Sequence, residues 1–544
     1  MKKERKKMKT KAIATLVLTL FLASSIMAFN VGPVHAVTVD VAPDTLNINS
    51  SGNWISAYIE PSVSFKDNFD NTLTGNDPSG WTEQGVGTWT IEKDATAPSQ
   101  GATGYGDVYS AKASSTYSTR DFSFMTVLSD FADGVFEFQF KLIDEAGVTE
   151  RITIPVRYQD DSNWILFDVD TGINYGRDVY CIFVSKAGSW TQLARKDVTI
   201  TKDVWHTMKI VTKGWDYEMW IDGVKELTAT DSIKAFDSGK IGLGVYRNTH
   251  AHFDNVLVSD IDIKTVDVST VKLWHMRFSD DFESYSTGTH SGGTGLGSWK
   301  YVSGTPSIIT DTVGGLSTQV LGIFGGSYVG EAVAVVGSSD WQDYTLDLDV
   351  KKQSGGYFNI VFRYYDPSNY YLLEPSSDAD HIALFKRVSG TFTELYKPRP
   401  TQPTVAGTWY HYRIELTTTA AGTNIKVFVD GVQKFDVTDN TGVLAKGSIG
   451  VGGYAGCEGR FDNIVVLSHI ADAIVDGALI NDYDSDGIPD MMVKFDRATV
   501  AQYINTNGLA GSNVELVITG KTTDGASFSG GDSVRVIAKG KVKV

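Results

Sequence analysis

The stretch Arg157-Tyr-Gln-Asp160-Asp-Ser-Asn163-Trp164 recurs later in the chain as Arg363-Tyr-Tyr-Asp366-Pro-Ser-Asn369-Tyr370. Further segments recur on both sides of this stretch, in the same order in both places. They are Phe65–Asp70 with Phe278–Glu283, Trp205 with Trp409, Ile221–Gly223 with Val429–Gly431, and Phe253–Asn255 with Phe461–Asn463. A collinear series of this kind indicates two copies of one structural unit.

Both copies have the pattern of β-strands. Residues 135–140 and 344–350 alternate apolar and polar side chains, and Asp222-Gly223 and Asp430-Gly431 lie between alternating runs, as hairpin turns do. No helical period interrupts either copy. We therefore predict an all-β sandwich of about 200 residues for each copy, a normal size for one all-β domain.

The order of these motifs resembles the LamG-like (concanavalin-like) jelly rolls of carbohydrate-binding modules and glycosidase-associated domains. The resemblance covers residues 62–258 and 277–467. It implies two jelly-roll sandwiches and a polysaccharide or other glycan as the ligand.

The remaining segments resemble a small β-sandwich module of secreted archaeal and bacterial proteins. The resemblance rests on Pro43–Asn47, Val268–Leu273 and Asp482–Arg497. We predict that residues 37–61, 259–276 and 468–544 form this third, discontinuous sandwich, and that the jelly rolls are inserted into two of its loops. Loops accept such insertions when the two ends of the inserted domain lie close together. A helix is expected at residues 498–504, with Asp496 as a possible N-cap.

Residues 1–36 have the three parts of a signal peptide: a basic start, an apolar run and a Val34-His35-Ala36 end. We expect cleavage after Ala36, no membrane insertion after that cleavage, and an extracellular protein that is released or held noncovalently at the cell surface. The net charge of −17 disfavours nucleic acid as a partner. The two cysteines fall in different modules, so a disulfide framework is not expected.

The segment Asp482-Tyr-Asp484-Ser-Asp486-Gly487-Ile-Pro-Asp490 predicts a calcium loop. Carboxylates at alternate positions, followed by a glycine that permits a sharp turn, bring several oxygens to one hard cation. The segment differs from an EF-hand because Val493 stands where the bidentate acid would be. The alternative is an acidic turn in solvent.

A second calcium prediction comes from carboxylates at matching positions near the first and last strands of each copy. The resemblance to LamG-like jelly rolls implies that these strands are neighbours and share the ion. The pairs are Asp67 with Asp280, Asp70 with Glu283, and Asp254 with Asp462. The alternative is that these residues form turns.

Strand alternation predicts a glycan-binding face in each copy. The side chains expected on one open face are Arg157, Trp164 and Asp168 in the first copy and Arg363, Tyr370 and Glu374 in the second. Sugars pack their C–H faces on aromatic rings, while their hydroxyls hydrogen-bond to guanidinium and carboxylate groups. The alternative is a structural Arg–Asp bridge beside core aromatic residues.

Evidence for catalysis is weaker. Glycoside hydrolases need two carboxylates around the scissile bond, and the E-x-D-x-x-E strand of sandwich-fold glucanases is absent from the sequence. His250-Ala-His252 suggests a metal site, but Arg460 stands at the position that matches His252, which favours a surface pair. We predict a calcium-stabilised carbohydrate-binding or adhesion protein without catalysis. A glycosidase or keto-sugar hydrolase on the same fold and a structural surface protein are the alternatives.

Overall fold

The protein is described by a computed structural model. It describes residues 34–537 except 43–44, 48–52, 70–74, 86–87, 95, 97–106, 113–121, 146–148, 248, 291–294, 304, 314–315, 325–331, 377–380, 398–403, 442–443, 455, 476–477 and 485–487. The chain divides into two compact units. Residues 61–262 form one unit, and residues 1–60 with 263–544 form the other.

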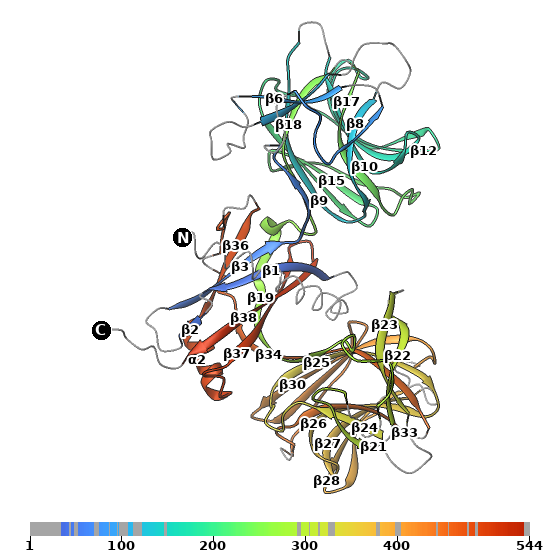
Figure 1. Ribbon diagram of the computed structural model, residues 1–544, viewed down its shortest axis with the longest axis vertical. Coiled ribbons are helices and arrows are strands. Elements are labelled where there is room, and N and C mark those ends of the chain that lie inside the picture. Colours follow the sequence, from blue (N-terminus) through green and yellow to red (C-terminus); the bar gives the residue numbers. More distant parts are fainter. Residues whose placement is uncertain are drawn as a thin grey trace, which may run out of the picture. The chain divides into compact units, whose positions relative to one another are not determined.

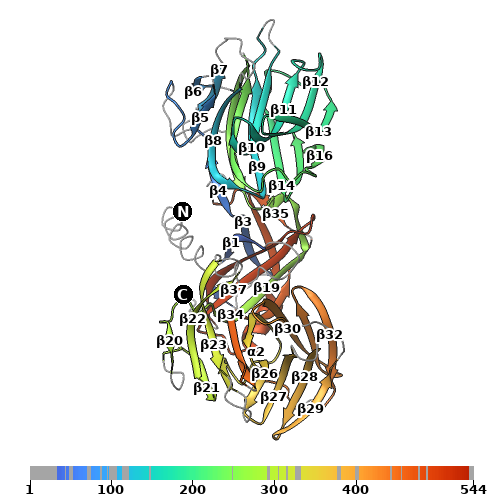
Figure 2. The ribbon, with the colours of Figure 1, turned by 90° about the vertical axis from the view of Figure 1, so that its right-hand side faces the viewer.

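The 61–262 unit is a sandwich of two sheets (Figures 1 and 2). The seven-stranded sheet has the order β13 (Ser189–Asp197), β12 (Asp178–Lys186), β11 (Asn163–Thr171), β10 (Arg151–Asp160), β17 (Gly239–Tyr246), β8 (Phe122–Phe131) and β5 (Thr82–Gly85). The eight-stranded sheet has the order β16 (Val224–Thr230), β15 (Asp216–Ile221), β14 (His206–Lys213), β9 (Gly134–Leu142), β18 (His250–Ser259), β7 (Asp107–Lys112) and β6 (Thr88–Lys93), with β4 (Val63–Asp67) paired to β18.

Alternation along the strands builds the core between these sheets. On β9, Phe136, Phe138 and Phe140 are buried in the core, and on β10 Ile152 and Ile154 face them from the other sheet. Burying a side chain of this kind stabilises the fold by about 1.5–3 kcal/mol. The two ends of this unit meet, because Asp260 N donates to Ser62 O at 3.0 Å.

The other unit contains the second sandwich. Its seven-stranded sheet has the order β21 (Lys300–Ser303), β24 (Ala332–Val336), β33 (Ser448–Tyr454), β26 (Tyr357–Asp366), β27 (Asn369–Ser376), β28 (His381–Val388) and β29 (Thr391–Tyr396). A facing sheet begins with β32 (Val432–Asp439), β31 (Gly422–Val429), β30 (Trp409–Thr419), β25 (Tyr344–Ser354) and β34 (Glu458–Asp472), with β20 (Gly288–Thr289), β22 (Thr305–Val313) and β23 (Leu316–Phe324) off this path.

That facing sheet continues beyond the sandwich. After β34 come β19 (Val266–Asp280), β37 (Asn513–Thr522), β38 (Ser527–Ile537), β1 (Val34–Ala42), β3 (Trp54–Pro61), β36 (Asp490–Asp496) and β35 (Leu479–Asn481), and β2 (Thr45–Asn47) pairs with β38. Strands from three distant parts of the sequence thus share one sheet. A 3₁₀ turn, η1 (Ile263–Thr265), precedes β19, and α2 (Arg497–Thr506) follows β36.

The structure tests several of these predictions directly. The all-β class is confirmed, and the predicted helix is α2, with Asp496 Oδ1 accepting from Thr499 N at 2.8 Å as its N-cap. Cys181 and Cys457 are free and buried.

Residues 1–33 of the predicted signal peptide lie outside the described residues, and Val34–Ala36 begin β1, pairing with residues 527–529. Cleavage after Ala36 would remove that pairing. Among the described residues, no helix has both the length and the apolar character needed to cross a bilayer.

Candidate functional site

Arg157 lies inside the first sandwich, which differs from the open-face position expected from alternation. The register of β10 shifts after Val156, and Arg157 has a φ of 51°, so its side chain turns toward the interior. The guanidinium is held by carbonyl oxygens of Ala132, Gly214 and Phe236 at 2.6–2.9 Å, and the residue is 1% exposed. Arg157 is therefore a structural clamp, as in the alternative considered for it.

Arg363 repeats this arrangement in the second sandwich. Its φ is 45°, and its guanidinium donates to Gln342 O and Leu444 O at 3.0 Å and to Asp343 Oδ1 at 3.1 Å. The backbone N–H of Arg363 donates to the hydroxyl of Tyr344 at 2.8 Å. Neither arginine is open to a ligand.

Trp164 does lie on the outer face of the seven-stranded sheet, away from the main core. It is buried in a second aromatic cluster with Phe122 and Phe124, whose ring centroids lie 5.0 and 5.1 Å from its own. Trp190 packs edge-on against it at 5.0 Å and is itself 45% exposed. This outer face therefore has an aromatic layer that reaches solvent at Trp190.

Asp168 shares that face with Arg151, a residue that the sequence analysis did not select. The Arg151 guanidinium forms a buried ion pair with the Asp168 carboxylate and lies 4.9 Å from the ring centroid of Tyr246. Burial raises the pKa of Asp168 to about 6 in spite of this ion pair. Alternation along β10 could have indicated Arg151, because Arg151 and Thr153 precede the bulge and point away from the core residues Ile152 and Ile154.

Four buried side-chain atoms on this face make no hydrogen bond to any residue in the described part of the chain. They are Nε of Arg151, Oγ1 of Thr153, Nε1 of Trp164 and Oδ1 of Asp168. Thr153 pairs with Asp168 across β10 and β11, and Arg151 forms its ion pair with Asp168, so three of these atoms lie together, while Trp164 stands four residues before Asp168 on β11. A buried polar group without a partner costs about 1–3 kcal/mol, and three close together indicate a place suited to an additional polar partner.

The matching face of the second sandwich has different chemistry. Tyr357, Asn359 and Glu374 stand at the positions of Arg151, Thr153 and Asp168. Tyr370 is buried and stacks on Tyr364, and Glu374 is half-buried on β27. The amide of Asn359 is fully buried, and within the described ranges neither of its side-chain polar atoms has a hydrogen-bond partner.

The predicted calcium loop brings three of its carboxylates together. Oxygens of Asp482, Asp484 and Asp490 lie within 4.8 Å of one another, and Tyr483 N donates to Asp490 Oδ2 at 2.8 Å. Asp486 lies outside the described residues. Carboxylate oxygens at this spacing suit a hard cation.

The second group of predicted calcium ligands is less compact. Asp254 and Asp462 are buried, and each accepts from the next residue's N–H. Glu283 accepts from Gln319 N at 2.7 Å, and Asp70 lies outside the described residues. Burial raises the pKa of Asp462 to about 8, with a further contribution from Asp349, Asp281 and Glu283. Asp67 and Asp280 instead each accept a hydrogen bond from a tryptophan indole at 2.8 Å.

Two sandwiches of this topology, each with an aromatic and polar outer sheet face, define a concanavalin-like jelly-roll protein. The family model described as the 3-keto-alpha-glucoside-1,2-lyase-like domain matches residues 64–259 and 293–467. Since these matches cover well over half of the chain, the protein belongs to this family.

Solved structures similar to the chain include the carbohydrate-binding module CBM66 from Bacillus subtilis, at 20% identity and a TM-score of 0.26, covering 35% of this chain and 99% of that chain. A Bacillus licheniformis beta-glucanase matches at 14% identity and a TM-score of 0.25, covering 39% of this chain and 99% of that chain. A Bacillus subtilis protein of unknown function with a galectin-like fold matches at 12% identity and a TM-score of 0.27, covering 37% of this chain and 98% of that chain. No curated protein matches the chain.

Proposed function

We propose that this is an extracellular carbohydrate-binding protein, and that the outer face of the seven-stranded sheet in the 61–262 unit binds the glycan. The observation that carries the proposal is an outer sheet face on which Trp190 reaches solvent beside Trp164, with polar atoms of Arg151, Thr153 and Asp168 further along the same sheet that have no partner among the residues described. A sugar stacked on the indole of Trp190 presents hydroxyls that both donate and accept hydrogen bonds. Such hydroxyls complement a face made of guanidinium, carboxylate and hydroxyl groups.

The second jelly roll is proposed to bind a different glycan. Its matching face carries the neutral Tyr357 and Asn359 in place of Arg151 and Thr153, and Phe392 lies edge-on to Tyr370 as Trp190 does to Trp164. Phe392 is 43% exposed. The cation on this face, Arg387, is half-buried and lies over the rings of Tyr370 and Phe392 at 5.8 and 4.9 Å. Arg151 in the first copy is instead buried beside a carboxylate, so the preference of the two faces for charged sugars should differ.

A glycan array with the full chain, followed by titration of the best ligands, tests this proposal. Trp190→Ala should weaken the ligands of the first copy about three- to tenfold, because an aromatic contact contributes about 0.5–1.5 kcal/mol. Phe392→Ala should affect a different set of ligands. Trp54→Ala, at a side chain of similar exposure (46%) outside both jelly rolls, is the matched control. Equal affinity of all three variants and the unaltered chain for every glycan would refute the assignment of these faces.

A second candidate function is a 1,2-lyase acting on a 3-keto-glucoside, as the description of the family suggests. In this reaction a base removes the proton on C2, next to the C3 ketone, and the group on C1 leaves with the electron pair. Asp168 favours this candidate, because a buried carboxyl group with a pKa of about 6 is suited to accept a proton near neutral pH. Release of an unsaturated keto sugar by the full chain but not by Asp168→Asn would establish it. Binding of the sugar without release of a product would support the carbohydrate-binding function alone.

Calcium is proposed to stabilise the loop of Asp482, Asp484 and Asp490. The grouping of three carboxylates supports this role, and the repulsion around Asp462 supports a second cation near Asp349 and Glu283. Export through residues 1–36 and a nested arrangement of the two jelly rolls are also part of the proposal. Support for the nesting comes from the pairing of β3 with β36 and of β19 with β37.

A further inference from the structure

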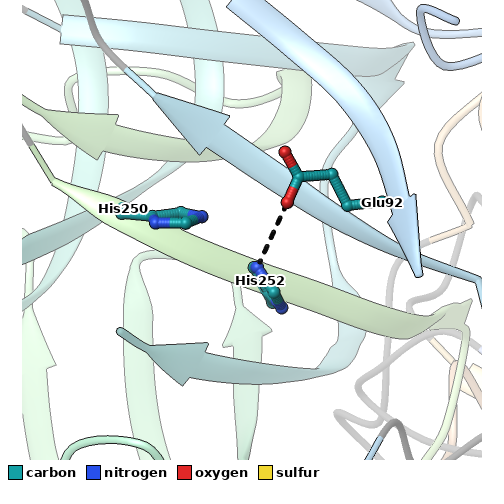
Figure 3. A group of neighbouring side chains, drawn as sticks. All are labelled: Glu92, His250 and His252. Atoms are coloured by element: carbon teal, nitrogen blue, oxygen red, sulfur yellow. Dashed lines mark ion pairs between the residues drawn. The ribbon is translucent and has the colours of Figure 1, made fainter. Parts of the chain in front are cut away.

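The histidines of the His250-Ala-His252 segment point away from the core of the first sandwich. Ala251 and Phe253 are buried in the core, so the two imidazoles lie on the outer face of the eight-stranded sheet. This is not the sheet that carries the proposed glycan face. Figure 3 shows Glu92 reaching toward His252 from another strand, and the sheet order places β6, which carries Glu92, next to β7 and β7 next to β18.

These three side chains converge. One ligand atom from each of Glu92, His250 and His252 lies within 4.8 Å of the other two. The Oε2 atom of Glu92 is 3.9 Å from Nε2 of His252. His252 is 8% exposed, and its buried Nε2 has no hydrogen-bond partner among the residues that the structure describes. A buried ring nitrogen aimed at a carboxylate and at a second imidazole, without a hydrogen bond to either, needs a further partner.

The other ring nitrogen of each histidine is held by a carboxylate. Nδ1 of His252 lies 2.9 Å from Asp94 Oδ2, and Nδ1 of His250 lies 3.2 Å from Glu145 Oε1. A carboxylate that accepts a hydrogen bond from Nδ1–H keeps the proton on Nδ1, which leaves the lone pair on Nε2 and fixes the direction of the ring. This is the arrangement that supports histidine ligands in metal sites.

Asp94 is itself fixed in place. Lys141 forms a short ion pair with it, and Thr96 donates to it from both N and Oγ1, at 2.8 and 2.7 Å. The orientation of His252 is therefore determined by a chain of contacts that would exist without a ligand. A preorganised donor set of this kind binds with less loss of conformational entropy.

In the second jelly roll, other residues occupy the positions that match Glu92 and the two histidines. Asp311 and Lys351 match Asp94 and Lys141 and form the same ion pair. Arg460 stands at the position of His252 and donates to Asp311 Oδ2 at 2.6 Å and to Glu458 Oε1 at 2.7 Å. Glu458 matches His250, and Ile309 matches Glu92. A protein cation thus fills this position in the second copy, and the first copy has three neutral or anionic donors there.

We infer that Glu92, His250 and His252 form a binding site for one divalent transition metal ion of the zinc class. Two imidazoles and one carboxylate are the donors that zinc takes in sites with three protein ligands. Imidazole nitrogen also selects against calcium and magnesium, which prefer oxygen.

Modest closure would complete the site. Zinc bonds of about 2.0–2.1 Å place tetrahedral ligands roughly 3.4 Å apart. The 3.9 Å between Glu92 and His252 must therefore shorten by about half an ångström, and the separations from His250, which are within 4.8 Å, by up to about 1.4 Å. The side chain of Glu92 is 49% exposed and can make this movement. The solvent side leaves a fourth position for water or for a hydroxyl of a bound molecule.

Titration of the untagged full chain with Zn²⁺ in excess calcium tests this inference. One equivalent should bind, and Co²⁺ should replace it with a visible ligand-field absorption of a tetrahedral nitrogen and oxygen site. Glu92→Gln, His250→Gln and His252→Gln should each weaken binding by roughly a hundredfold, and Asp94→Asn by about ten- to a hundredfold. His469→Gln, at an exposed histidine outside the cluster, should leave binding unchanged.

Glu92→Gln keeps the inference falsifiable even if a histidine variant unfolds, because Glu92 is exposed and its neutral form keeps the same shape. Unchanged Zn²⁺ affinity in Glu92→Gln and His250→Gln would overturn the site. An equal loss in His469→Gln would do so as well, because binding would then be nonspecific. Neither result depends on whether the protein binds glycans, since no glycan is present in the titration.

Discussion

The two jelly rolls share one local arrangement of a lysine, a tryptophan and an aspartate, and they differ in the residue that completes it. In both, a lysine lies over a tryptophan, Lys141 over Trp205 at 5.3 Å and Lys351 over Trp409 at 5.0 Å, and pairs with an aspartate. The second copy completes this ion pair with Arg460, and the first places His252 there. The difference teaches that a salt-bridge network and a candidate metal site can be alternative completions of one scaffold.

The largest expected effect is exchange of the metal site between the copies. Glu92→Ile with His250→Glu and His252→Arg gives the first copy the residues of the second, and the chain should then bind no Zn²⁺ at this site. The reciprocal change, Ile309→Glu with Glu458→His and Arg460→His, should raise the stoichiometry from one ion to two, since Asp311 can orient the new histidine. Metal content after dialysis measures both. If the reciprocal variant folds but still binds only one ion, the shared lysine–aspartate arrangement is not sufficient to support a metal site in the second copy.

The next effect concerns the outer face of the seven-stranded sheets. Arg151→Met leaves the buried Asp168 without its cation and should lower the free energy of unfolding by roughly 3–5 kcal/mol. Tyr357→Met at the matching position should cost about 1 kcal/mol, because only an aromatic contact is lost. Urea unfolding followed by tryptophan fluorescence compares them. Adding Asp168→Leu to Arg151→Met should recover most of the loss, and a lack of recovery would show that the charge on Asp168 is not its cause.

A pH dependence should distinguish the second jelly roll from the first. His411 lies 2.9 Å from Asp349 and 3.3 Å from Asp347, and Thr207 matches it in the first copy. Burial alone would lower the pKa of His411, but these carboxylates raise it to about 9.

Because that pKa lies above the unfolded value of about 6.5, the stabilisation is fully present below pH 6.5 and is lost as the pH rises through about 9. The raised pKa of His411 corresponds to a stabilisation of roughly 3 kcal/mol. The difference between the stability profiles of the unaltered chain and His411→Thr should show this decline. A flat difference between pH 6 and 10 would contradict it.

The smallest effect is that of calcium on the loop beside β36. Free calcium at tenfold its Kd should stabilise the unit that contains the loop by about 1.4 kcal/mol. Chelation should therefore lower the melting midpoint, and Asp484→Ala with Asp490→Ala should remove the response to calcium. The Glu92→Gln variant should keep that response. A midpoint that chelation leaves unchanged would exclude calcium from the loop.

Sequence patterns predicted the strands and the helix cap because these depend on neighbouring residues. Ile152 and Ile154 lie in the core, on the face opposite to Arg151 and Thr153, as strand alternation requires. Alternation failed at Arg157, because a bulge with a positive φ reverses the direction of the side chain, and nothing in the sequence marks a bulge at an arginine. Arg151 precedes the bulge, so alternation places it correctly on the outer face, and it was left out although the pattern could have indicated it.

The histidine pair shows a different limit. Comparing the two copies argued against a metal site, because Arg460 matches His252. That comparison treats repeats as equivalent, whereas the structure shows an arginine that satisfies a local aspartate in one copy and a histidine aimed at Glu92 in the other. Glu92 itself could not be connected to the pair from sequence, since it lies far away in the chain and approaches only through the order of the sheet.

The meeting of both ends of the first jelly roll has a mechanical consequence. Val63 pairs with Ser259 and Asp67 with Val256 in an antiparallel ladder, so the chain enters and leaves at the same end of β4 and β18. Tension along the chain would act on the hydrogen bonds between β4 and β18 one after another. The rest of the sandwich would bear the force only after these bonds had broken. Under stretching this domain should yield at low force, from its entrance, with β4 detaching first.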